Sequence, residues 1–86
     1  MIKMKFERKV KLMTEEKYKL ANKFLFGYAF DNDLYGEFKY KEILFQKDEE
    51  VMIYSEFGLK QVTIRTNNIR EANNLEQELK RINYKE

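Results

Sequence analysis

Hydrophobic and charged residues alternate along the first twelve positions of the chain. The even positions are hydrophobic except for Arg8: Ile2, Met4, Phe6, Val10 and Leu12. The odd positions are mostly lysine: Lys3, Lys5, Glu7, Lys9 and Lys11. Because successive side chains of a strand point to opposite sides, a period of two predicts a half-buried strand here. The hydrophobic side should face a core and the lysines should face solvent.

Two later segments have the signals of amphipathic helices. Thr14 with Glu15 and Glu16 begins the first, because a hydroxyl can accept an orphan backbone N–H and early carboxylates suit the positive end of the helix dipole. This helix is expected to reach about Tyr28, with a hydrophobic stripe that Phe26 lies outside: Tyr18, Ala21, Leu25 and Tyr28, widened by Leu20 and Phe24. Asn67 or Asn68 should cap the second helix, and if Asn68 is the cap, Glu71 would complete a capping box. The hydrophobic residues of this helix form a narrow stripe: Ile69, Ala72, Leu75, Leu79 and Ile82.

The region between the helices has the patterns of strands and turns. Residues 31–36 are rich in Asp, Asn and Gly and predict a turn. Phe38 and Tyr40 share one parity and Ile43 and Phe45 the other, which indicates one strand with a bulge near Lys41 or Glu42. Residues 51–57 predict a central strand, residues 58–60 a hairpin connection, and residues 61–65 a last short strand. The expected fold is α+β in the order β-α-β-β-β-α, a single domain over residues 1–86 with about four antiparallel strands and both helices on one face.

Composition removes several classes of chemistry. The chain has neither cysteine nor histidine, which excludes disulfides, thiolate nucleophiles, zinc sites of the Cys/His kind and Ser-His-Asp triads. Its carboxylate pairs have no predicted pocket or nucleophile beside them, so we expect no enzyme and no cofactor. We also expect a soluble, cytoplasmic protein that does not enter a membrane, because no segment has the apolar length of a signal peptide or a membrane span.

The lysines of the first strand form one candidate binding surface: Lys3, Lys5, Lys9 and Lys11. Residues two apart on a strand project about 7 Å apart, close to the phosphate spacing of a nucleic-acid strand. Tyr40 and Tyr54 could stack on bases beside them. Alternatively, the lysines protect an exposed strand from pairing and the tyrosines belong to the core. A net charge of only +2, with acidic clusters at residues 31–37 and 48–50, makes nucleic acid the second choice.

Aromatic residues near the end of the first helix form the other candidate surface. Phe26 lies off the core stripe, Phe30 ends the helix, and Tyr35 lies in the acidic turn. Aromatic side chains rimmed by charge are typical of protein interfaces. The alternative is that the following strands cover this cluster.

A calcium-loop template also matches in part: Asp31, Asp33, Gly36, Phe38 and Glu42 stand at its positions 1, 3, 6, 8 and 12. Position 5 is Tyr35, which is a poor ligand, and residues 38–45 resemble a strand more than the exit helix that such a loop needs. We therefore assign no metal to the chain.

These observations favour a small non-catalytic protein-binding module over a nucleic-acid-binding domain. The partner would be another protein, either a host target or a second copy of the chain. The richness in Lys, Asn, Ile and Tyr without tryptophan is similar to that of small accessory proteins of AT-rich bacteria and their phages. That compositional resemblance implies an accessory protein of a phage or mobile element that inhibits or modulates a host protein.

Overall fold

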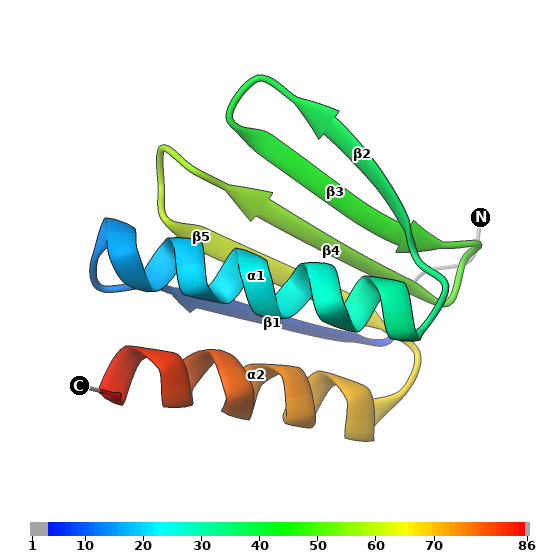
Figure 1. The fold of residues 1–86 in the computed structure, drawn as a ribbon. Coiled ribbons are helices and arrows are strands. Elements are labelled where there is room, and N and C mark those ends of the chain that lie inside the picture. The colour runs from blue at the N-terminus through cyan, green and yellow to red at the C-terminus, as the bar shows by residue number, and fades with distance from the viewer. Residues whose placement is uncertain (1–3, 86) are drawn as a thin grey trace.

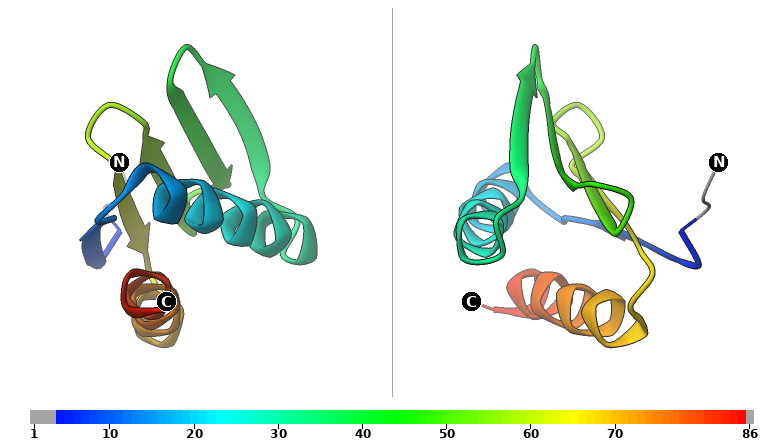
Figure 2. Two further views of the ribbon diagram at one scale, coloured as in Figure 1. Left: turned by 60° about the vertical axis from the view of Figure 1, so that its left-hand side comes forward. Right: turned by 90° about the vertical axis from the view of Figure 1, so that its right-hand side faces the viewer.

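A five-stranded antiparallel sheet with two helices on one face makes up the fold (Figure 1). The computed structural model describes residues 4–85. Its elements are β1 (Phe6–Lys11), α1 (Glu15–Asp31), β2 (Tyr35–Lys39), β3 (Glu42–Lys47), β4 (Val51–Glu56), β5 (Gln61–Thr66) and α2 (Ile69–Tyr84). The strand order β1-β5-β4-β3-β2 places β1 and β2 at opposite edges and β4 at the centre. The predicted α+β class and the helices on a single face are confirmed (Figure 2), with five strands in place of about four.

The strand register determines which side chains reach the core between the sheet and the helices. Val10 lies opposite Val62, and Ile64 lies opposite Ile53, which in turn lies opposite Phe45. The buried residues of strands and helices form a single cluster: Val10, Leu12, Tyr18, Ala21, Leu25, Ala29, Phe45, Val51, Ile53, Val62, Ile64, Leu75 and Leu79. The other face of the sheet carries no helix, and we call it the open face (Figure 2).

The expected single strand with a bulge is wrong, because this segment is the hairpin β2–β3. Lys39 pairs with Glu42, so Tyr40 and Lys41 alone form the turn, and Lys41 adopts a left-handed φ of 63°. A two-residue turn puts Phe38 and Ile43 opposite each other on the same face. Because an even-numbered residue of β2 lies opposite an odd-numbered residue of β3, the hydrophobic positions change from even to odd along the sequence, as they would at a bulge. The turn is hard to recognise in the sequence because Lys41 occupies its left-handed position, where glycine or asparagine is usual.

Helix α1 begins as predicted and continues three residues beyond Tyr28. The Thr14 hydroxyl accepts a hydrogen bond from the backbone N–H of Lys17 at 3.1 Å. Ala29 is buried while Tyr28 is only half-buried, and Leu20, expected to widen the hydrophobic stripe, is 53% exposed. Two residues along a helix correspond to about 200° of rotation, which turns Leu20 away from the core side held by Tyr18.

Helix α2 has the predicted cap, but the capping box is wrong. The Asn68 side chain accepts from the backbone N–H groups of Arg70 and Glu71. The Glu71 carboxylate does not return to Asn68. It accepts instead from the Thr66 hydroxyl at 2.6 Å and from the Tyr28 hydroxyl. Glu71 thereby connects α2 to β5 and α1. Burial raises the pKa of Tyr28 above its ordinary value, and the hydrogen bond to Glu71 and the charge of Glu71 raise it further. At the same end of α2, Ile69 is 49% exposed and is no part of the core stripe.

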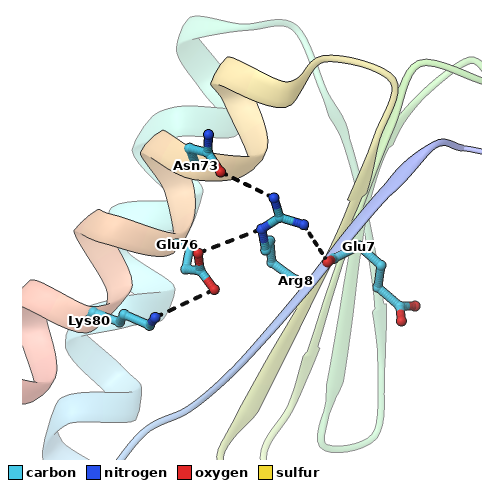
Figure 3. A network of polar contacts seen from close by, with 5 residues as sticks. All are labelled: Glu7, Arg8, Asn73, Glu76 and Lys80. Atoms are coloured by element: carbon cyan, nitrogen blue, oxygen red, sulfur yellow. Dashed lines mark hydrogen bonds and ion pairs between the residues drawn. The ribbon is translucent and has the colours of Figure 1, made fainter.

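Arg8 is the polar residue among the hydrophobic positions of β1, and its side chain pairs with residues of α2 (Figure 3). Its guanidinium donates to the Asn73 side chain at 3.2 Å and lies 3.6 Å from the Glu76 carboxylate. Glu76 also pairs with Lys80 at 3.6 Å, as the i,i+4 spacing predicts. Within residues 4–85 neither helix has the length and apolar character that crossing a membrane requires.

Candidate protein-binding surface

The outer edge of β1 is partly covered by side chains. Leu12 donates its backbone N–H to Lys60 at 2.7 Å, so the even residues of β1 face β5 and the backbone groups of the odd residues point away from the sheet. Asn83, a buried residue of α2, donates to the carbonyl of Lys11 and accepts from the backbone N–H of Met13, both at 2.9 Å. Its amide therefore pairs with this edge as a strand residue would.

Lysine side chains of β1 point to the open face, as the alternation predicts. Lys9 and Lys11 of β1 are exposed, Lys5 is exposed in the bend before the strand, and Lys3 lies outside the described residues. Glu7, on the same side of the strand, pairs with Arg65 at 2.7 Å. Lys9 and Lys11 make no ion pair with any residue in the described range 4–85. The lysine row is thus a real feature of the surface, although a short one.

The two tyrosines proposed as base-stacking platforms do not lie beside the lysine row. Tyr54 is separated from Lys9 by Thr63 on β5, or about 10 Å across two strand spacings. Tyr40 lies in the β2–β3 turn, at the opposite edge of the sheet. The structure therefore does not combine lysines and tyrosines into one surface.

Carboxylates surround Tyr54 on the open face. Glu42 and Glu56 lie directly opposite each other on β3 and β4, and Glu37 and Glu42 line a small hollow with Tyr54. Hydrogen bonding to Glu42, partial desolvation and the charges of Glu42 and Glu56 raise the pKa of Tyr54 to about 12. A phosphate approaching this tyrosine would meet negative charge.

Replacing Glu42 with glutamine is expected to lower the pKa of Tyr54 from about 12 toward the ordinary 10.0. The substitution removes the charge that disfavours the tyrosinate. NMR titration of ring-labelled tyrosine would measure the change. Glu49→Gln, in the exposed β3–β4 turn, is the matched control and should leave Tyr54 unchanged. Equal pKa values in wild type and Glu42→Gln would contradict the acidic environment described for Tyr54.

Aromatic side chains gather instead at the β2 edge, and we call this set the aromatic edge. Their exposed fractions are large for side chains of this size: Phe26 41%, Phe30 86%, Tyr35 82%, Phe38 64% and Tyr40 87%. Phe26 stacks on Phe38 with ring centroids 5.6 Å apart and meets the buried Phe45 edge-on at 5.3 Å. The following strands thus cover Phe26 in part and leave the others open to solvent. Sequence reasoning missed Phe38, because a residue of the expected continuous strand would have had a neighbour on both sides.

The backbone of β2 is available on its outer side. Phe57 donates to the Lys41 carbonyl at 3.0 Å, which directs the odd residues of β3 toward β4 and the even ones toward β2. By the same alternation, the N–H and C=O groups of Gly36 and Phe38 point away from the sheet. No strand of residues 4–85 pairs with this side of β2.

A cleft of about 350 Å³ adjoins the aromatic edge beside the β2–β3 turn. Hydrophobic side chains line it together with a charged rim: Tyr18, Asn22, Phe38, Lys39, Lys41, Glu42, Ile43 and Phe57. The polar groups at its base bond to one another, with Ser55 joined to the Tyr18 hydroxyl at 2.7 Å and to the Asn22 side chain at 2.6 Å. The cleft therefore extends the apolar surface of the aromatic edge.

The calcium-loop resemblance is not matched by the geometry. Asp31 ends α1, and the hairpin β2–β3 occupies the place of the exit helix. In the part of the chain that the structure describes, no three acidic side chains converge closely enough to hold a metal ion.

Comparisons of the chain with family models, with curated proteins and with solved structures found no match.

Proposed function

We propose that this protein is a non-catalytic protein-binding module, and that its partner adds an extended segment to the outer side of β2. The observation that carries the proposal is the coincidence of two features on this strand. Gly36 and Phe38 offer backbone groups that no strand of residues 4–85 pairs with, and β2 with its turn carries three strongly exposed aromatic side chains, Tyr35, Phe38 and Tyr40. Strand addition takes its affinity from main-chain hydrogen bonds and its specificity from the flanking side chains.

The contrast between the two sheet edges supports this assignment. Proteins protect edge strands with charged side chains, especially lysine, and by covering them. At β1 both devices are present, with Lys9 and Lys11 along the strand and Asn83 on its outer backbone groups. At β2 the charged residues are Glu37 and Lys39, its other large side chains are the exposed Tyr35 and Phe38, and nothing in residues 4–85 pairs with its outer backbone groups. Aromatic side chains of this kind anchor protein interfaces.

Nucleic acid remains the second candidate, supported by Lys9 and Lys11 on the open face and by the exposed Lys5 before β1. The acidic surroundings of Tyr54 and the pairing of Glu7 with Arg65 weigh against it, because a bound polyanion would have to follow a surface of mixed charge. That the partner is a host protein, and that binding inhibits it, stays a prediction drawn from composition.

Replacing Gly36 with proline is expected to reduce capture of the partner about tenfold or more. Proline removes the outward N–H, and its ring is tolerated where an edge strand faces solvent. Gly36→Ala is the matched control, since it keeps the N–H and its added Cβ meets Phe45 and Phe38 only at ordinary distances of 3.6 and 3.7 Å. The measurement is a pull-down from a lysate of the source organism, washed across a salt series and analysed by mass spectrometry.

A protein retained at high salt by wild type and by Gly36→Ala, but lost with Gly36→Pro, would support the proposal. A double variant, Lys9→Ala with Lys11→Ala, should behave as wild type. Retention that is nuclease-sensitive, that salt abolishes and that the lysine variant loses would contradict the proposal and favour nucleic acid.

A further inference from the structure

We propose that the segment added to β2 is the β2 strand of a second copy, paired antiparallel about a two-fold axis at Phe38. This inference depends on the proposed function, because it names the partner of the same edge. Two-fold interfaces use one patch twice, so the strand must be complementary to itself. The sequence of β2, Tyr-Gly-Glu-Phe-Lys, meets that condition in only one register.

The backbone leaves few registers to consider. Within β2, Gly36 and Phe38 point their N–H and C=O groups outward, so hydrogen-bonded pairs must join even residues of one copy to even residues of the other. A two-fold axis that satisfies this rule within β2 passes through Gly36, Glu37 or Phe38.

Charge distinguishes these three axes. An axis at Glu37 places that carboxylate directly opposite its own copy, and like charges in this position destabilise a strand pair. An axis at Gly36 places Glu37 opposite Tyr35 and Lys39 opposite Asp33, which lies outside the strand, so it gives no ion pair within β2. An axis at Phe38 places Glu37 of each copy opposite Lys39 of the other, which gives two ion pairs.

The side chains on the helix-covered face suit the same register. Phe38 meets Phe38 of the second copy, and the two Phe26–Phe38 stacks become neighbours across the axis. Gly36 lies opposite Tyr40 in the β2–β3 turn of the second copy, so the smallest residue of the strand faces a large one. Phe38, 64% exposed in the single chain, thereby gains the neighbour that it lacks.

The edge at β1 does not offer an equivalent pairing. Its outward backbone groups belong to Glu7, Lys9 and Lys11. An axis at Lys9 or Val10 would place lysines opposite each other, and an axis at Arg8, which pairs Glu7 with Lys9, would place two arginines opposite each other. Asn83 already occupies the outer groups of Lys11 and Met13. A second copy is therefore expected at β2 and not at the first strand.

Charge reversal in the full chain tests the register. Sedimentation of the purified protein over micromolar to millimolar concentrations should give twice the chain mass of 10.6 kDa for wild type. Glu37→Lys and Lys39→Glu should each sediment as a monomer, because each brings like charges together at both pairs. An equimolar mixture of these two variants should form a heterodimer, and the double variant carrying both changes should dimerise again. Circular dichroism of each variant verifies that it remains folded.

Two results would overturn the inference: wild type at the monomer mass throughout the range, or single variants that dimerise as well as wild type. A monomeric wild type that still captures a lysate protein, with Gly36→Pro abolishing capture, would reject the second copy and retain the proposed function. A dimer that persists in Gly36→Pro would reject strand addition at β2, and with it both proposals.

Discussion

Replacing Phe45 with alanine is expected to lower the free energy of unfolding by about 3–5 kcal/mol. Phe45 is 1% exposed and lies opposite Ile53 on the neighbouring strand. Its ring meets that of Phe26 edge-on, with ring centroids 5.3 Å apart. Truncation removes a large transfer free energy and leaves a cavity that the rigid sheet cannot close. Domains of this kind have about 5–15 kcal/mol of stability in total, so the variant should be close to unfolding. Urea denaturation followed by circular dichroism would measure the loss.

Phe38→Ala is the matched control because it removes the same side chain from the neighbouring strand. Phe38 is 64% exposed and contacts mainly Phe26, so its truncation should lower the unfolding free energy by about 1 kcal/mol or less. Equal losses for the two variants would mean that the hairpin β2–β3 does not pack as described. The comparison also separates two roles, because Phe45 holds the aromatic edge in place whereas Phe38 belongs to the surface that a partner would contact.

Short sequence patterns predicted the features that depend on residues close by in the sequence. The alternation of residues 2–12 identified β1, although the strand covers only Phe6–Lys11 of that range. The narrow stripe of α2 identified Leu75 and Leu79 as core residues. Asn68 and Thr14 cap their helices as expected, since a cap depends only on the next few residues. Residues 51–57 were expected in the middle of the sheet because both faces carry large side chains, and β4 is the central strand.

Features that depend on distant partners could not be predicted. Glu71 has the spacing of a capping box, yet Thr66 and Tyr28 bond to its carboxylate because the fold brings them closer. The acidic surroundings of Tyr54 come from a neighbouring strand whose pairing no short-range pattern reveals. The candidate site shows the same limit. Phe26, Phe30 and Tyr35 were identified from the sequence, but the importance of Phe38 and Gly36 depends on β2 being an edge, which follows only from the strand order.

Replacing Asn83 with alanine is expected to lower the free energy of unfolding by about 2 kcal/mol, the second large effect. The side chain is 8% exposed and makes two hydrogen bonds of 2.9 Å to the outer edge of β1. Alanine would leave the Lys11 carbonyl and the Met13 N–H without that partner in a partly covered position. Chemical denaturation would measure the change.

Asn74→Ala supplies the control on the exposed side of α2 and should change stability by about 0.5 kcal/mol or less. Similar losses for Asn83→Ala and Asn74→Ala would show that the edge contact contributes nothing. Sedimentation of Asn83→Ala tests how the two edges differ. If β1 is protected mainly by Lys9 and Lys11, uncovering its backbone should create no new association. Self-association through β2 should then persist in Asn83→Ala, because Asn83 lies at the other side of the sheet.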